Sequence, residues 1–465
     1  MFDLKEVTRP MAKTAVRDLT TGSPMKLIVG FAAPLMFGFL FQQLYSFVDA
    51  AIVGRFLGSS ELAAVGSTGS LNFLILGLSG GMCSGFAIPI AQAVGAKDDT
   101  ELRRNVFNAT YLCIVISVLL GLVTGILTGP MLRWLNTPGD IIVSATKYLR
   151  LILWTLPVMV LYNMSSAILR SLGDSKTPVY YLILASIVNI VLDLVFILWF
   201  RMGVQGAALA TAISQLASGL GCLLTLVRRF PSLRPQADDA ALRPDYCRRL
   251  VGVGPPMGLQ FSITAIGSVV LTGSVNALGT VYVAAVTAGG KLSAFFCTVF
   301  DALSSTMATF AGQNLGARKL KRIHEGLKAA SIVGCIYCVA ALIVILLAGK
   351  PMMTMFVDAA ETEVINFAQQ YLVTFGVFYI PLLFVNIVRL TIQGMGYTRL
   401  AVIAGVLEMI ARAVVGGLLV PVFGFTAACL ASPAAWLLAD AFLFPAYRTV
   451  MKKMYSRLYP AGMNQ

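Results

Sequence analysis

Two aspartates lie within apolar stretches that contain no basic residue to neutralise them. Asp49 stands in "FVDAAIVG", and Asp193 ends "NIVLD", which begins with Asn189. An isolated carboxylate in apolar surroundings is costly, so each must be neutral, bind a cation or face water. With the hydroxyl of Thr211, these side chains offer oxygens suited to Na⁺ or to a shared proton. We predict a cation site at Asp49, Asn189, Asp193 and Thr211; simple interhelical hydrogen bonding is the alternative.

The composition identifies these apolar surroundings as a lipid bilayer. The 465 residues are 58% hydrophobic and 12% charged, about half the charged fraction of a typical soluble domain. Apolar stretches of about 20 residues, enough to cross about 30 Å of hydrocarbon, recur along the whole chain. We predict an all-α polytopic membrane protein with twelve transmembrane helices, near residues 27–54, 62–90, 105–128, 142–168, 178–200, 203–227, 250–278, 283–312, 327–349, 364–393, 400–420 and 424–447.

The net charge of +14 is unevenly distributed along the chain. Most Lys and Arg residues fall in the segments that alternate helices place on one side, such as the run from Arg228 to Arg249. Cytoplasmic loops are enriched in these residues, so we expect a multi-pass protein of the cytoplasmic membrane with both termini in the cytoplasm. The basic surplus then matches anionic membrane lipids, and no nucleic-acid partner is needed.

The predicted topology places the two aspartates at one depth. Both of their helices run outward, with Asp49 six residues before Arg55 and Asp193 eight residues before Arg201. At 1.5 Å per residue, both carboxylates lie about 9 to 12 Å below the outer surface. Thr211 lies at the same level on the returning sixth helix. The four predicted site residues can therefore meet.

The chain repeats itself after 221 residues. This shift pairs Pro34 with Pro255, Gly58 with Gly279, "AQAVGAKD" with "GQNLGARK", Gly173 with Gly394 and Gly203 with Gly424. We predict two parallel six-helix repeats, an architecture typical of transporters that work by alternating access. The expected divisions are a cytoplasmic N-terminal segment (1–24), an N-lobe (25–227), a cytoplasmic linker (228–249), a C-lobe (250–447) and a cytoplasmic tail (448–465).

The second half carries acids and bases together within its helices. Glu408 and Arg412 are four residues apart, acid first, which is the favourable order for an ion pair on one helix face. We predict a C-lobe polar cluster of Asp301, Glu408 and Arg412. A static ion pair and a role in substrate binding or coupling are both open for it.

The motifs together resemble those of the multidrug and toxic compound extrusion (MATE) transporters. The resemblance rests on "PLMFGFLFQQLYSFVDAAIVG", on "NIVLD", on the paired QxxGA[KR] loops and on the doubled plan, and it covers residues 25–447. It implies two lobes in a V and a secondary transporter that exports amphipathic, often cationic compounds against inward H⁺ or Na⁺. It also implies that the N-lobe cation site is Asp49, Asn189, Asp193 and Thr211. Pro34 would be a hinge in the first helix.

One departure from the family concerns the seventh helix, where several subfamilies carry a glutamate. The corresponding position here is about Thr264, and this helix contains no acid. We therefore expect coupling through the N-lobe. Phe37, Phe41 and Tyr45 precede Asp49 at spacings of four and are candidates for the substrate cavity, with core or lipid packing as the alternative. We expect no cofactor and a monomer.

Three other functions compete with an antiporter. A lipid or lipid-linked oligosaccharide flippase of the same superfamily would suit a cationic cavity better than an acidic N-lobe. A membrane-embedded enzyme would need catalytic residues, but the chain has one histidine, His324, and no GxSxG motif. A passive channel would not require duplicated lobes with buried acids.

Overall fold

The computed structural model describes residues 17–459 except 136 and 237, and every regular element in this part of the chain is helical. The N-lobe comprises α1 (Pro24–Leu57), α2 (Ser59–Ser67), α3 (Gly69–Ala96), α4 (Asp99–Trp134), α5 (Ile142–Trp154), α6 (Leu156–Ser171), α7 (Lys176–Leu194), the π-helix η1 (Val195–Trp199) and α8 (Val204–Arg229). After η2 (Pro231–Leu233) and α9 (Pro244–Val251), the C-lobe comprises α10 (Gly254–Asn276), α11 (Thr280–Gly316), α12 (Leu320–Met353), α13 (Thr362–Val377), α14 (Tyr379–Gly394), α15 (Thr398–Val414), the π-helix η3 (Val415–Leu419) and α16 (Val420–Leu458).

The helices account for twelve membrane crossings. Within the described residues, nine helical segments are long and apolar enough to span a bilayer, and two bent pairs, α5 with α6 and α13 with α14, complete further spans. One of the nine runs for 61 residues from Thr398 to Leu458 and contains the non-helical Gly424. This segment is long enough for two crossings of about 20 residues each. The predicted fold class and helix number are therefore confirmed.

The backbone reveals the internal repeat at its turns. Left-handed or otherwise positive φ angles recur 221 residues apart, at Gly58 and Gly279 (93° and 119°), at Lys97 and Arg318 (56° and 58°), and at Gly203 and Gly424 (62° and 61°). The predicted pairing of Gly173 with Gly394 is wrong. Gly173 has a φ of 92°, and its counterpart is Gly396 with a φ of 90°, whereas Gly394 ends α14. Extra residues before α13 shift the register here to 223.

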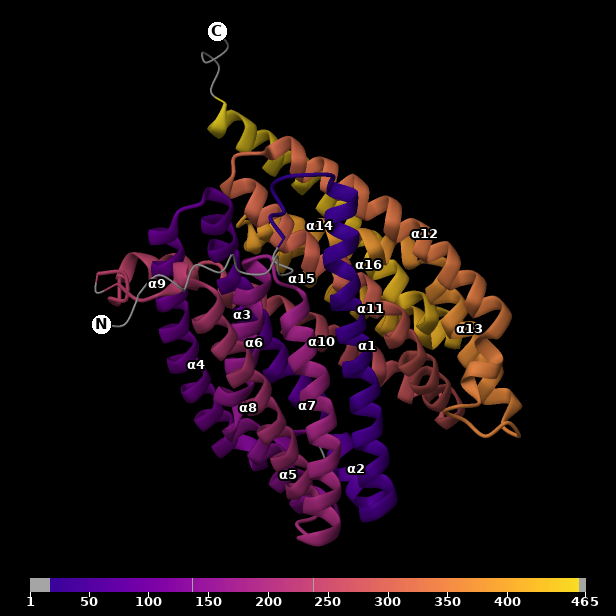
Figure 1. The fold of residues 1–465 in the computed structure, drawn as a ribbon. Helices are drawn as coiled ribbons and strands as arrows, with labels where there is room; N and C mark the ends of the chain where they lie inside the picture. Colours follow the sequence, from indigo (N-terminus) through magenta and orange to yellow (C-terminus); the bar gives the residue numbers. More distant parts are fainter. Residues whose placement is uncertain (1–16, 136, 237, 460–465) are drawn as a thin grey trace.

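The two lobes form a V that is closed at one end (Figure 1). The start of α1 and the end of α16 lie at the closed end, and the lobes diverge toward α2 and α5 on one arm and α13 on the other. Contact between the lobes comes from α3 packing against α10 and α11, and from α1 packing against α11 and α12. The first half of α1 even belongs to the C-lobe core, where Phe31 and Leu35 are buried.

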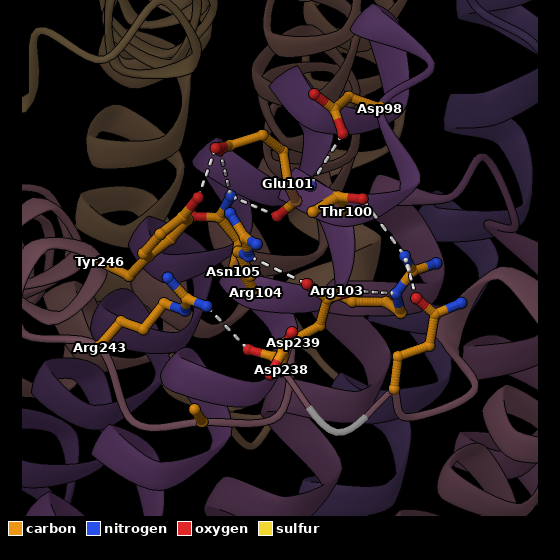
Figure 2. Close-up of polar contacts among 12 residues, drawn as sticks. Asp98, Thr100, Glu101, Arg103, Arg104, Asn105, Asp238, Asp239, Arg243 and Tyr246 are labelled. Atoms are coloured by element: carbon orange, nitrogen blue, oxygen red, sulfur yellow. Dashed lines mark hydrogen bonds and ion pairs between the residues drawn. The ribbon is translucent and has the colours of Figure 1, made fainter.

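The segment between the lobes is docked onto the N-lobe (Figure 2). Asp239 accepts hydrogen bonds from Arg103 Nε at 2.7 Å and from Arg104 Nε at 3.0 Å. Tyr246 of α9 donates to the carboxylate of Glu101. Hydrogen bonding from Arg103, with that from Arg104 beside it, lowers the pKa of the Asp239 carboxyl. The linker is thus held against the start of α4.

The C-terminal helix extends beyond the predicted end of the C-lobe. We expected a tail from residue 448, yet α16 continues to Leu458. Tyr447, Val450, Met451 and Met454 are buried against the C-lobe core, while Lys452, Lys453 and Arg457 are exposed. An amphipathic last stretch therefore stays helical by packing on the protein. The predicted N-terminal segment lies mostly outside the described residues.

Candidate functional site

Helix α7 positions two of the four predicted site residues. Asn189 and Asp193 lie one turn apart and are fully buried, with 0% exposure. The π-helix η1 begins two residues after Asp193, and such wide turns are frequent at functional sites. Because α7 packs against both α1 and α8, its buried face meets the helices that carry Asp49 and Thr211.

The carboxyl groups of Asp49 and Asp193 lie within hydrogen-bonding reach of each other. The Oδ1 atom of each is buried and has no partner among the described residues. No Lys or Arg in this part of the chain forms an ion pair with either acid. Two ionised carboxylates in contact away from water repel strongly. Asp193 is fully buried and Asp49 is partly exposed, so a shared proton or a bound cation would relieve this repulsion.

Asn189 links this pair to the third helix. In the amide orientation that satisfies both of its polar atoms, Asn189 donates to Asp193 Oδ2 at 3.1 Å and accepts from the backbone N–H of Thr211 at 3.1 Å. The hydroxyl of Thr211 donates to the carbonyl of Ala207 at 3.0 Å. The structure thus brings all four predicted residues together. Only the carboxylates keep unused hydrogen-bonding capacity toward a bound ion.

Two tyrosines border the acids, and sequence reasoning missed one of them. Tyr45 of α1, predicted to line a cavity, has its hydroxyl beside Thr211. Tyr148 of α5 is 7% exposed and packs in the same buried cluster as Ile52 and Val53, one turn beyond Asp49. In the sequence, Tyr148 lies between Lys147 and Arg150 near a helix end, so nothing marked it as a neighbour of an acid.

The remaining predicted residues of α1 lie nearer its first half. The helix passes through Pro34 without a break, so the hinge stays a prediction. Phe37 and Phe41 are exposed at 54% and 41%. They share one face of the helix, as predicted, and their role as substrate contacts stays a prediction too.

The closed end of the V is built from the paired QxxGA[KR] motifs. Gln92 of α3 donates to the carbonyl of Gly394 at 3.2 Å, and Gln313 of α11 donates to that of Ser171 at 2.7 Å. Each glutamine therefore binds the opposite lobe at equivalent positions. The helices touch here, because a Cβ on Gly95 would lie 1.8 Å from Gln313 O. A Cβ on Gly316 would lie 1.9 Å from Gln92 O in the same way.

Residues 17–22 seal this end from one side. Leu19 is fully buried; its N–H donates to Gln313 Oε1 at 3.1 Å and its carbonyl accepts from Asn314 at 3.1 Å. Arg17 donates its backbone N–H to the carbonyl of Gly173 at 3.0 Å. The segment therefore joins a turn of the N-lobe to α11 of the C-lobe. On the other side, Arg249, the last residue of the linker, donates to Gln92 Oε1 at 3.3 Å.

A family model described as MatE matches residues 34–195 and again residues 256–418. The chain belongs to the MatE family. The two matches together cover more than half of the chain and fall once in each lobe, as the repeat requires. MatE proteins are secondary transporters, in general cation-coupled antiporters, so this multi-pass membrane protein is a transporter and not an enzyme.

Similar proteins support the assignment along most of the chain. A probable multidrug resistance protein of Bacillus subtilis, YoeA, is 28% identical over 341 residues, which cover 71% of this chain and 73% of that protein. The FAD transporter of Shewanella oneidensis is 23% identical over 362 residues, covering 77% and 79%. A solved structure described as the outward-facing conformation of a multidrug resistance MATE family transporter covers 94% of this chain and 98% of its own, with a TM-score of 0.88 and 22% identity.

The C-lobe of this MatE protein holds an ion triad that differs from the predicted cluster. Glu408 binds both Arg389 and Arg412, the latter at 3.3 Å, and all three are at most 5% exposed. Asp301, predicted to join Glu408 and Arg412, forms no ion pair with a described residue and is exposed on α11. The predicted ion pair of Glu408 with Arg412 is therefore confirmed, whereas the inclusion of Asp301 is wrong. Helical spacing relates residues within one helix, and the second partner of Glu408, Arg389, comes from another helix, α14.

Proposed function

We propose that this MatE chain is an antiporter that admits protons and exports amphipathic, cationic compounds. The observation that carries the proposal is the contact between Asp49 and Asp193, two acids with buried oxygens and no basic partner among the described residues. Contact between two carboxyl groups favours a bound proton, so the pair can alternate between two states that differ by one proton and one charge. The relative named a multidrug resistance protein supports amphipathic compounds as the substrate class.

The surroundings of the pair favour a proton over Na⁺. Asn189 turns its amide nitrogen toward Asp193, so its oxygen points away from the acid pair and toward the backbone of Thr211. Sodium prefers several oxygen ligands, whereas a proton needs only two.

In the proposed cycle, a proton entering from the open end of the V neutralises the acid pair. This change in charge lets α1 and α7 repack. The exported compound leaves as one lobe rocks against the other. Moving one charge inward yields about 2.3 kcal/mol per 100 mV of membrane potential. One proton can therefore sustain a gradient of a few tens for a neutral compound, since 1.4 kcal/mol is about a factor of ten. A singly charged cation exchanged for one proton moves no net charge, so its export is driven by the pH gradient instead.

We also propose the orientation and the divisions of the chain. The closed end, which carries the linker and the ends of the described chain, faces the cytoplasm across the cytoplasmic membrane. Support comes from the basic residues there, including Arg228, Arg229, Lys319 and Lys452. The N-lobe would be 25–227 and the C-lobe 250–447, joined by the linker 228–249 and acting as a monomer. A flippase is not favoured, since the relatives described above are named as a multidrug resistance protein and an FAD transporter.

Transport by reconstituted vesicles tests the proposal. A fluorescent cationic dye is loaded, and H⁺ and Na⁺ gradients are imposed separately on wild type, Asp49→Asn and Asp193→Asn. We expect export driven by H⁺ alone, reduced to the protein-free background in both variants. Asp140→Asn is the matched control, because Asp140 is exposed and makes no hydrogen bond or ion pair with a described residue. Export driven by Na⁺, or H⁺-driven export by Asp49→Asn, would contradict it.

A further inference from the structure

Helix α11 has one polar face in an otherwise apolar environment. At 3.6 residues per turn, six polar side chains between Thr287 and Thr309 fall within about 80° of the helix circumference. Thr298 and Thr309 are buried, and the other four are at least partly exposed: Thr287, Lys291, Asp301 and Ser305. Thr287, Lys291 and Asp301 are exposed, whereas the opposite face supplies the C-lobe core through residues such as Phe300 and Leu303. A charge exposed to lipid chains in the middle of a membrane helix is expensive. The polar face therefore borders water.

Three turns further along α11, the same face packs against α3 of the N-lobe. Gly312 lies eleven residues after Asp301, and a Cβ on Gly312 would be 3.0 Å from Ala91 Cβ of α3. Eleven residues correspond to about 16 Å of helix. Asp301 is thus exposed on this face about three turns from the point where α11 contacts α3, on the side toward the open end of the V.

On the opposite wall, the face of α3 that carries Ala91 is open at this level, although α3 still packs against α10 here, where a Cβ on Gly81 would lie 2.7 Å from the Phe261 ring. Gly80 of α3 is the repeat equivalent of Asp301 and shares a helix face with Ala91. A Cβ on Gly80 would meet no atom within 4 Å, in contrast to a Cβ on Gly95 near the closed end. Two turns above Gly80 on this face, Phe73 is 57% exposed. Asp301 on α11 and Phe73 on α3 thus lie on the two helix faces that meet, further along, at Gly312 and Ala91.

No other charged group in the described chain neutralises Asp301. Its carboxylate forms no ion pair, and the two buried arginines of the C-lobe are bound to Glu408. The coupling acids are on α1 and α7, inside the N-lobe. Lys291 shares the polar face of α11 but lies ten residues, or about 15 Å, nearer the open end.

We propose that Asp301 is the substrate-binding carboxylate of this transporter and receives the cationic group of the exported compound, while Phe73 contacts its apolar body. An acid and an aromatic face are the two groups that bind an amphipathic cation. This inference rests on the proposed function and names a binding site separate from the proton site. Asp301 therefore determines selectivity for charge, and Asp49 with Asp193 determines coupling.

Equilibrium dialysis of the purified full-length protein tests the site. The probes are tetraphenylphosphonium, a cation, and triphenylphosphine oxide, which is uncharged and otherwise similar. In Asp301→Asn, we expect the Kd for tetraphenylphosphonium to rise about tenfold or more, the loss expected for a hydrogen-bonded or paired charge. Asp301→Glu keeps the charge and should stay within about threefold. The Kd for triphenylphosphine oxide should be unchanged in both variants.

A second variant tests the cavity without altering charge. Gly80→Leu fills the open space opposite Asp301 and should weaken binding of both probes, while Gly129→Leu, also with open space around its Cβ, should weaken neither. Equal affinity of wild type and Asp301→Asn for tetraphenylphosphonium, equal loss of both probes in Asp301→Asn, or no binding by wild type overturns the inference. If binding depends on Asp301 but no proton gradient drives export, the site stands and the antiport proposal fails.

Discussion

The two halves of the internal repeat are alike at the closed end of the V and differ at the level of the buried acids. At the closed end, Gln92 and Gln313 make equivalent bonds to opposite lobes, and Gly95 and Gly316 meet equivalent carbonyls. Higher up, the N-lobe has two acids in contact without a base, and the C-lobe has an acid held by two arginines. Both halves must fit one another to close, so the contact surfaces stay alike. Under the proposed function one proton site is sufficient, and the interiors of the lobes are then free to differ.

The largest expected effect is a difference in unfolding free energy between variants that remove an acid from the C-lobe and from the N-lobe. Glu408→Gln leaves Arg389 and Arg412 buried without a full countercharge and should cost about 3 to 5 kcal/mol of unfolding free energy. Asp49→Asn removes a repulsion and should change it by less than about 1 kcal/mol. Denaturant unfolding of the purified protein in detergent measures both, with Glu363→Gln at an exposed position as control. Equal losses would mean that the two acidic groups are both structural.

A second prediction concerns the contact between α3 and α11. Gly95→Ala and Gly316→Ala each push a methyl group against backbone and should destabilise the closed end by about 1 to 3 kcal/mol. Hydrogen exchange at residues 17–23 and at the end of α3 should then accelerate. Gly290→Ala on α11 has open space and is the control. An effect from only one of the two glycines would break the symmetry described above.

The glutamines should differ slightly despite their equivalent bonds. Gln313 is 1% exposed and also accepts from Leu19, whereas Gln92 is partly exposed. Gln313→Ala leaves buried groups unpaired and should cost about 1 to 3 kcal/mol, and Gln92→Ala about 1 kcal/mol. Trypsin cleavage after Arg17 reports the difference and should accelerate only in Gln313→Ala. Faster cleavage in Gln92→Ala alone would reverse the ranking.

The smallest effect distinguishes the segments that precede the two lobes. Because the folded-state pKa of Asp239 is lowered, its contribution to linker docking is complete above the unfolded value of about 3.9 and is lost as the pH falls through the folded value. Hydrogen exchange at 238–243, corrected for its intrinsic pH dependence, should therefore accelerate only below about pH 4. Residues 17–22 bind α11 through amides and should not respond. Asp239→Asn at pH 7 should reproduce the effect of acid.

Periodicity and charge predicted most of the fold, because a membrane helix can be recognised from the length and apolar composition of its sequence. The meeting of Asp49, Asn189, Asp193 and Thr211 also followed from topology, since depth along a helix is a linear function of residue number. Contacts that depend on lateral packing did not follow. Arg389 of α14 binds Glu408 of α15, and Tyr148 of α5 lies near Asp49 and Asp193. Asp301 belongs neither to the N-lobe acid pair nor to the C-lobe ion triad. The register error at Gly173 arose because a shift counted in sequence ignores where extra residues are absorbed.

The bond between Leu19 and Gln313 joins residues that are 294 positions apart. At roughly 5 to 20 residues per second, the ribosome needs about 15 to 60 seconds to make the chain between them. During that time the first lobe is already in the membrane with its entrance unsealed. The segment around Leu19 must therefore wait, unpaired, until α11 has been inserted. Closure of this end therefore requires α11 and cannot be completed by the N-lobe alone.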